Sequence, residues 1–470
     1  MKIAFAHYHL KTGGVTTVLR QQIEAVRDAG EVLVLTGEPP EQPFPVETVT
    51  IHGLGYDNRP ETSLPPEDIA DAIIRAVTTK WSDGCDILHV HNPLLNKNAN
   101  LLKILKILQK KNISLFLQIH DFAEDGRPQS YFSDEYLQDC HYGVINTRDY
   151  DILIDAGLKS DGLHKIPNTI KFFDLKQKNE IPFTPVLYPI RAIRRKNIGE
   201  AILLSLFFRN NAPLAFTLPP NSPSDIRSYE GWKAFVEEKR LNVLFDAGLS
   251  YEFSDLVLAS ESLMTTSVTE GFGFSFLEPW TAKKFLWGRR LPDICSDFIN
   301  NGVQLDHLYT RLHVPIEWVG KKKLYQRWRS CVLKNSARFN IPIDNERLTT
   351  SFEKTTRNNI IDFGLLDETF QQGIISGLLS SSAYRDRVIR LNAHLESPGR
   401  VSNQQALIEK NRSAVIRNYN KSLYQKRLFK AYTRVIKTSV VQKINKSRLL
   451  QHFFTPEAFS LLKWGDDVDA

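Results

Sequence analysis

The stretch Thr265–Trp280, TTSVTEGFGFSFLEPW, combines a Gly-Phe-Gly turn with two glutamates that have seven residues between them. Glycine carries no Cβ, so Gly271 and Gly273 allow the backbone to approach a ligand closely. We expect a strand to end before this turn and a helix to start near Phe274. The unpaired amides at the start of such a helix favour an anion, for example a diphosphate.

The glutamates of this stretch, Glu270 and Glu278, distinguish it from an ordinary strand-to-helix loop. Glu270 stands before the turn and can reach a ligand held there. Glu278 lies about one helical turn beyond Phe274 and can accept hydrogen bonds from a ribose diol. The turn has only two glycines, one on each side of Phe272, so it lacks the third glycine of the dinucleotide-binding fingerprint. Without the paired glutamates, a plain loop would be the simpler interpretation.

A cluster of four basic residues follows a predicted strand in Tyr188–Asn197, YPIRAIRRKN. Arg191 and Lys196 would lie on the loop after this strand, at the edge where open α/β sheets bind ligands. A departing nucleoside diphosphate gains negative charge, which two fixed cations stabilise more in the transition state than in the ground state. Arg194 and Arg195 are close enough to leave the assignment within the cluster open. The alternative is a set of solvated surface charges.

His120 follows the apolar run LFLQI, so it marks the carboxyl end of another strand. It can hydrogen-bond a sugar hydroxyl there, or it can be an internally satisfied structural residue. His89 and His91 alternate along the preceding strand, but no carboxylate or cysteine at ligand spacing completes a metal site with them. We therefore predict no metal centre. Asp467–Asp469 has the D-x-D spacing of a metal-binding motif but stands in the terminal tail.

Short apolar runs alternate with helical periodicity, which predicts parallel strands joined by helices. The predicted strands are Lys2–Ala6, Val32–Thr36, Ile87–His91, Leu115–Ile119 and Gly143–Asn146, then Val186–Tyr188, Leu214–Leu218, Asn242–Phe245, Met264–Ser267 and Phe285–Trp287. The pattern restarts after a proline-containing linker at Asn179–Pro185. We expect an α/β protein with two Rossmann-like doubly wound domains, residues 1–180 and 181–420, that face a central ligand cleft, followed by a helical extension, 421–470.

Positive charge is concentrated near the C-terminus. Residues 401–450 contain 12 Lys and Arg but only one acidic residue, Glu409, so their local charge is +11. The net charge of the whole chain is +7, and the remaining residues therefore carry −4. A solvated helix pair is the simpler interpretation. Contact with an anionic membrane surface is the functional one. Few aromatics are interleaved with these charges, so nucleic-acid binding is not predicted.

The amino-acid composition excludes several classes of protein. The chain has 470 residues, 42% hydrophobic and 24% charged, which excludes disorder and a small disulfide scaffold. Its four cysteines form no C-x-x-C pair and favour a reducing compartment. The N-terminus lacks the apolar core of a signal peptide, and no run reaches the ~20 apolar residues of a spanning helix. We expect a cytoplasmic protein, at most peripheral to a membrane.

The Glu270/Glu278 pair resembles the E-x7-E signature of retaining GT-B glycosyltransferases, above all glycosyltransferase family four. Thr12–Val15 resembles the family's glycine loop, where the Gly14 amide would face the donor phosphate or the acceptor. Gln118–Asp121 resembles the strand ending in a histidine that faces the donor sugar. Ile166-Pro167-Asn168 resembles the Pro-Asn that closes the first domain. Arg191 and Lys196 match the Arg-x4-Lys pair that the family uses on the donor diphosphate.

The resemblance implies transfer of a hexosyl group from a nucleotide diphosphate sugar to a hydroxyl acceptor, with retention and without a catalytic metal or cofactor. His120 and Glu270 would be catalytic, while Gly14, Arg191, Lys196, Gly271, Phe272, Gly273 and Glu278 would bind the donor. The family's small-residue segment is replaced by bulkier residues at 283–298, which leaves the acceptor unassigned. A nucleotide-sugar epimerase and a non-catalytic carbohydrate-binding protein remain alternatives. A phosphorylase is disfavoured, because no pyridoxal lysine or free-phosphate site is recognisable.

Overall fold

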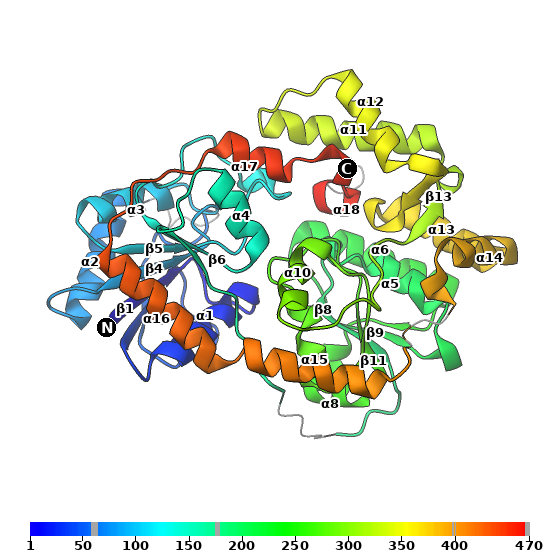
Figure 1. Cartoon of the computed structure of the whole chain (residues 1–470), viewed down its shortest axis with the longest axis horizontal. Helices are drawn as coiled ribbons and strands as arrows, with labels where there is room; N and C mark the ends of the chain where they lie inside the picture. The colour runs from blue at the N-terminus through cyan, green and yellow to red at the C-terminus, as the bar shows by residue number, and fades with distance from the viewer. Residues whose placement is uncertain (58–63, 174–178, 397–398, 400, 466–470) are drawn as a thin grey trace. The chain divides into compact units, whose positions relative to one another are not determined.

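The computed structural model describes residues 1–57, 64–173, 179–396, 399 and 401–465. The chain divides into unit 1, Met1–Ile170 with Asn418–Phe454, and unit 2, Lys171–Arg417 with Thr455–Ala470 (Figure 1). The predicted boundaries at 180 and 420 differ from this division. The predicted extension 421–470 is divided between the units. Its residues up to Phe454 belong to unit 1, because apolar side chains of its first two helices pack in the cores of that unit. Asp467–Asp469 lie outside the described residues.

Unit 1 contains a seven-stranded parallel sheet with the order β3-β2-β1-β4-β5-β6-β7. Its strands are β1 (Lys2–His7), β2 (Glu31–Thr36), β3 (Thr48–Thr50), β4 (Ile87–His91), β5 (Leu115–Gln118), β6 (His141–Val144) and β7 (Leu163–Lys165). Alternate residues of β1 enter separate cores, Ile3 and Phe5 on one face and Ala4 and Ala6 on the other. The strand order reverses between β1 and β4, the switch point at which ligands bind such sheets.

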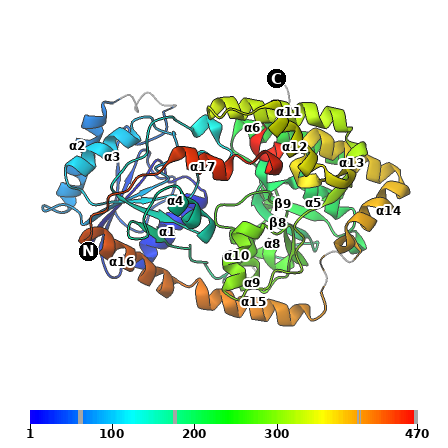
Figure 2. The same cartoon turned by 45° about the horizontal axis from the view of Figure 1, so that its top comes forward.

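Helices cover both faces of this sheet, which explains why most residues of its strands are buried. They are α1 (Gly14–Val26), α2 (Pro66–Lys80), α3 (Leu101–Lys110), α4 (Thr147–Asp155), α16 (Lys421–Lys437) and α17 (Lys446–Phe453), with a 3-10 segment η2 (Pro128–Ser130). α16 lies beside α1 (Figure 1, Figure 2), and both contribute to one core. α2, α3 and α17 contribute to the other.

Unit 2 contains a five-stranded parallel sheet with the order β10-β9-β8-β11-β12 and a separate antiparallel pair, β13 and β14. The strands are β8 (Val186–Arg191), β9 (Leu214–Leu218), β10 (Val243–Leu244), β11 (Ser262–Thr265), β12 (Leu286–Gly288), β13 (His313–Pro315) and β14 (Ile360–Asp362). The predicted fold class, two doubly wound α/β domains, is thereby confirmed. β13 and β14 lie beyond the last strand that was predicted from the sequence, Phe285–Trp287.

The helices of unit 2 follow the strands and then accumulate towards the C-terminus. They are α5 (Ile198–Ser205), α6 (Pro223–Lys239), α7 (Ala247–Ser250), α8 (Phe253–Ala259), α9 (Glu278–Thr281), α10 (Pro292–Asn300), α11 (Lys321–Arg338), α12 (Asn345–Thr355), α13 (Glu368–Ser380), α14 (Ser382–Leu391), α15 (Gln404–Asn418) and α18 (Leu461–Trp464). The 3-10 segments are η3 (Arg194–Lys196), η4 (Arg209–Asn211), η5 (Phe274–Phe276), η6 (Ile316–Trp318), η7 (Arg357–Asn359), η8 (Phe363–Leu365), η9 (Ala393–Leu395) and η10 (Pro456–Ala458).

The basic C-terminal segment contains two long helices, α15 and α16, of which α16 is amphipathic. α16 buries Tyr424, Leu428 and Tyr432 in unit 1, while Lys426 and Lys430 are exposed on its other side. Within the described ranges, none of the helices combines the length and apolar character needed to cross a bilayer. Contact with an anionic membrane surface stays a prediction, which flotation with anionic and neutral liposomes would test.

Candidate active site

Lys196 and Glu270 form an ion pair beside the ends of two adjacent strands of unit 2. Lys196 ends η3, which follows β8, and Glu270 lies on the loop after β11. The Lys196 Nζ atom is 2.5 Å from Oε1 of Glu270, and their side chains are 16% and 12% exposed. Burial acts to raise the pKa of Glu270, but the charge and hydrogen bond of Lys196, aided by Arg195, hold that pKa below its usual value. Glu270 is therefore a carboxylate at neutral pH.

Glu278, the second glutamate of the motif, has a different electrostatic environment. It is the first residue of α9, and burial raises its pKa to about 7 although the charge of Lys196 opposes this shift. Glu270 and Glu278 thus both interact with Lys196, one directly and one at longer range. The structure therefore gathers three of the predicted site residues into one charged group within unit 2.

The backbone at Lys196 is fixed by side chains from both neighbouring strands. The carbonyl of Lys196 accepts hydrogen bonds from Tyr188 Oη at 3.0 Å and from Thr266 Oγ1 at 3.1 Å. The next residue, Asn197, has a φ of 52°, and its carbonyl also accepts from Thr266, at 2.9 Å. Tyr188 in turn bonds Ser267 at 2.9 Å. These contacts tie the lysine loop to the strand end that leads to Glu270.

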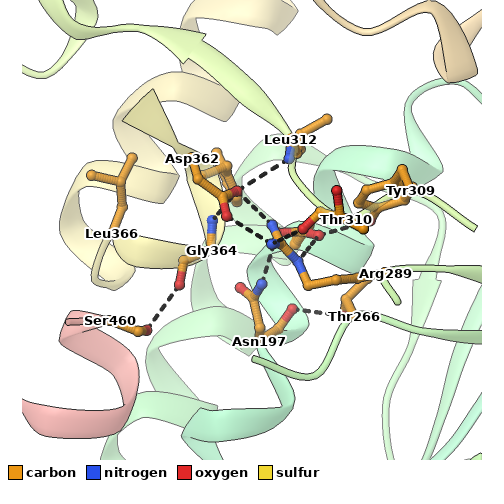
Figure 3. A network of polar contacts seen from close by, with 12 residues as sticks. Asn197, Thr266, Arg289, Tyr309, Thr310, Leu312, Asp362, Gly364, Leu366 and Ser460 are labelled. Carbon is orange, nitrogen blue, oxygen red and sulfur yellow. Dashed lines mark hydrogen bonds and ion pairs between the residues drawn. The ribbon is translucent and has the colours of Figure 1, made fainter. Parts of the chain in front are cut away.

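A buried network centred on Arg289 lies next to Asn197, the residue that follows Lys196 (Figure 3). The guanidinium group makes two hydrogen bonds to Glu200, at 2.8 and 2.6 Å, and two to Asp362, at 2.8 and 2.7 Å. Glu200 also accepts from Asn197 Nδ2 at 2.8 Å, and Tyr309 donates to Glu200 at 2.7 Å. Arg289 thus connects the bulky segment 283–298 to Asn197, the residue that follows Lys196.

The remaining basic residues of the loop have distinct partners. Arg191 donates from Nη1 to the carbonyl of Pro219 at 2.8 Å. Arg194 forms a nearly buried pair with Glu368, at 2.7 and 3.0 Å. Arg195 adds to the positive potential at Glu270. The alternative of four solvated charges therefore does not describe this loop, and the charges nearest Glu270 are Lys196 and Arg195.

The glycine turn differs in part from its prediction. Gly273 has a φ of 90°, and a Cβ there would lie 2.9 Å from Phe276, so this position requires glycine. Phe272 is buried and packs edge-on against Phe298, with ring centroids 5.6 Å apart. The predicted helix from Phe274 is instead a 3-10 turn, η5, followed by the four-residue α9. Pro279, near the start of α9, has no N–H to continue a helix from η5. Gly271 lies at the start of this turn.

His120 lies just beyond β5 in unit 1 and is held by the end of β4. Its Nε2 is 2.8 Å from Nδ1 of His91, and the two rings lie within 10° of coplanar. The backbone amides of His120 and Asp121 both donate to Oδ1 of Asn92, at 2.8 and 3.0 Å. Burial lowers the pKa of His120 to about 4, so its imidazole is neutral at physiological pH.

Two further features of unit 1 lie near the carboxyl ends of its strands. Gly14 is the first residue of α1, is exposed, and has open space where a Cβ would be. Arg127 pairs with Asp121 at 2.6 Å, and Lys97 lies over the ring of Tyr56 at 5.7 Å. Burial and the nearby Arg127 lower the pKa of Lys97. Within the described part of the chain Lys97 makes no ion pair.

Comparisons with known proteins give relatives in sequence and in structure, although no family model matches the chain. The chain is 28% identical over 414 residues to mannosylglucosyl-3-phosphoglycerate synthase of Petrotoga mobilis, a match that covers 78% of this chain and 79% of that protein. Sucrose-phosphate synthase from Thermosynechococcus elongatus has a similar structure, with a TM-score of 0.53, 14% identity, and coverage of 93% of this chain and 99% of that one. Anabaena HepE in complex with UDP has a TM-score of 0.51, 12% identity, and coverage of 92% and 100%.

The chain has the GT-B fold. The structural matches extend over nearly the whole of both neighbours, so both α/β units are included. The fold predicted from the sequence is confirmed.

Within this GT-B fold, the predicted site residues fall into two groups. Gly14 and His120 belong to unit 1, whereas the basic pair, the glutamates and the glycine turn belong to unit 2. No group of three or more His, Cys, Asp or Glu side chains suited to a metal ion occurs among the described residues. Sequence reasoning missed the supporting contacts of Asn92, Asn197 and Arg289. An arginine directly after an apolar strand was the one available signal for Arg289, and its partners are 89 and 73 residues away.

Proposed function

We propose that this protein is a retaining glycosyltransferase that moves a hexosyl group from a nucleotide diphosphate sugar to a hydroxyl acceptor. The observation that carries this proposal is the group formed by Lys196, Glu270 and Glu278 at the carboxyl ends of β8 and β11. It supplies a cation for a diphosphate, a carboxylate for the sugar and a second carboxyl group for a ribose. The sequence relative named a synthase of a mannosylglucosyl compound supports the same reaction class.

In the proposed reaction, the bond between the anomeric carbon and the diphosphate oxygen breaks, and a bond from the acceptor oxygen forms on the same face. The acceptor proton passes to the departing phosphate. Lys196, with Arg191 and Arg195 on the same loop, stabilises the charge that develops on the diphosphate. Glu270 holds the sugar, Glu278 holds the ribose, and the amide of Gly14 contacts a phosphate or the acceptor. His120 bonds a sugar hydroxyl.

Binding of the donor is tested first, because it separates this proposal from functions that need no nucleotide sugar. We expect one of a panel of UDP-, GDP- and ADP-linked glucose and mannose to raise the melting temperature, since a ligand that binds the native state stabilises it. Lys196→Met should abolish that shift. No shift with any donor at millimolar concentration would disprove the donor assignment. Isomerised donor without an acceptor would instead favour the epimerase alternative, and binding without turnover the carbohydrate-binding one.

We also propose that the acceptor carries an anionic group. Lys97 is a half-buried cation near Asp121, whose charge is already paired with Arg127, and the name of the sequence relative contains 3-phosphoglycerate. Glucosyl-3-phosphoglycerate should therefore be a better acceptor than glucosylglycerate. Lys97→Met should raise the KM for the phosphorylated acceptor roughly tenfold, the effect of losing one charged hydrogen bond. The exposed Lys103→Met is the matched control, and equal use of both acceptors would contradict the proposal.

We propose, finally, that the reaction needs no metal ion or cofactor. Lys196 and its neighbouring arginines can provide the positive charge that a diphosphate leaving group requires. Turnover in EDTA should equal turnover with added Mg²⁺ or Mn²⁺. A complete loss in EDTA that either metal reverses would show that a cation takes part.

A further inference from the structure

A hydrogen bond between two buried imidazoles lies behind His120. His91 is the last residue of β4 and is fully buried, and its Nδ1 lies 2.8 Å from Nε2 of His120. The adjacent Asn92 accepts the backbone N–H of His120. The end of β4 therefore holds both the backbone and the ring of His120. Among the neighbouring rings, His89 stacks on His91 at a centroid distance of 4.5 Å, Phe5 stacks on it at 6.1 Å, and His7 meets it edge-on at 6.1 Å.

We propose that His91 is a positioning residue that fixes His120 as the tautomer with its proton on Nδ1. The inference rests on the proposed function only where it assigns His120 to the donor sugar. The tautomer itself is a property of the free protein.

The argument starts from the hydrogen-bond capacity of neutral imidazole, which has one N–H donor and one bare nitrogen. Burial holds the pKa of both rings below its ordinary value, so neither is charged at pH 7. One ring must therefore donate to the other. The structure permits two arrangements, and they differ in what happens at Nε2 of His91.

Nε2 of His91 is buried and has no hydrogen-bond partner among the described residues. If His120 were the donor, His91 would carry its proton on this Nε2 and bury an N–H with no acceptor. If His91 donates from Nδ1, only a bare nitrogen is left there. Orphaned buried donors are rarer than under-used acceptors. The second arrangement is therefore favoured, and it leaves the proton of His120 on Nδ1, since the bond at one nitrogen sets the state of the other.

This tautomer gives His120 a defined chemical role. It offers an N–H to a hydroxyl oxygen of the sugar and has no bare nitrogen available to remove the acceptor proton. His120 is then a binding group and not a general base, which agrees with proton transfer to the departing phosphate. Rotation of the ring would break the bond to His91, so the donor direction is fixed before substrate binds.

Nitrogen-15 spectra of the full-length protein with labelled histidine test the proposal without requiring activity. The His120 signal is identified by its loss in His120→Gln. We expect the wild-type protein to show a neutral ring protonated on Nδ1. His91→Leu should convert it to a mixture of tautomers, whereas His91→Asn, which keeps an amide donor near the position of Nδ1, should preserve it. His89→Leu removes a neighbouring buried histidine bonded to Gln118 and Tyr432, and it should leave the His120 signal unchanged.

Kinetics with the donor give the second readout. His91→Leu should lower kcat/KM about tenfold, as expected for a hydrogen bond lost at the transition state, and His91→Asn should recover most of it. A wild-type His120 protonated on Nε2, or an unchanged His120 signal in His91→Leu, would overturn the proposal. If no nucleotide sugar binds, the proposed function fails, but the spectra still decide the tautomer.

Discussion

Glu270→Gln is expected to lower kcat by roughly 10²–10³-fold, the effect typical of removing one preorganised electrostatic contributor. The carboxylate lies against Lys196 at 2.5 Å, where we assign the transferred sugar. The substitution keeps the size of the side chain but removes its charge. Lys196 then has less negative charge near it, so the donor diphosphate should bind as well as before or more tightly. The expected pattern is therefore a fall in kcat without a rise in the donor KM.

Glu278→Gln is the matched control, and it should mainly weaken donor binding, by about 1.5–3 kcal/mol for a lost charged hydrogen bond. Because the pKa of Glu278 is about 7, wild-type donor binding should strengthen as pH rises through 7, and this slope should vanish in the variant. A raised carboxyl pKa also means that the folded state loses stability as pH rises from the ordinary carboxyl value towards 7. Glu278→Gln should remove that loss. A dead Glu278→Gln beside a Glu270→Gln altered only in KM would show that the roles are reversed.

Arg289→Met is expected to destabilise unit 2 by about 3–5 kcal/mol, because it leaves two buried carboxylates without their cation. Burial disfavours the charge of Arg289, but Asp362 and Glu200 outweigh that cost and keep its pKa above the usual range. Removing the guanidinium reverses this balance for both acids. Chemical unfolding with separate probes in the two units should show the loss in the transition of unit 2. Donor binding should weaken as well, since Glu200 also accepts a hydrogen bond from Asn197, beside Lys196.

Arg290→Met is the natural control for this substitution. Arg290 is the next residue, but its partner Asp306 is 90% exposed, at 3.1 Å, and such surface pairs contribute at most about 1 kcal/mol. The triple variant Arg289→Met, Glu200→Gln, Asp362→Asn should recover much of the lost stability, because it removes the unpaired charges together. If Arg289→Met cost no more than Arg290→Met, the network would not be the support that its geometry indicates.

The sequence predicted much of the local structure, because buried parallel strands are short apolar runs between helices. Ile87–His91 and Leu214–Leu218 match their observed strands residue for residue. The strand predicted at Gly143–Asn146 is observed at His141–Val144. Its start was missed because His141, although buried, is a polar residue and does not extend an apolar run in the sequence. β3, β7, β13 and β14 were missed because their sequences TVT, LHK, HVP and IID each contain a polar residue or proline. The equally short β12 was predicted, since it overlaps the apolar run Phe285–Trp287.

The spacing of Glu270, Glu278, Arg191 and Lys196 predicted a ligand site at one sheet edge, because residues at the ends of parallel strands lie along that edge. The resemblance to family-four glycosyltransferases then implied glycosyl transfer at this site. Only the tertiary structure showed that Lys196 forms an ion pair with Glu270, whereas Arg194 forms one with Glu368. It also decided that His91 holds the ring of His120. These outcomes depend on contacts between residues 29 to 174 positions apart, and a pattern read over one helix or strand carries no information on such pairs.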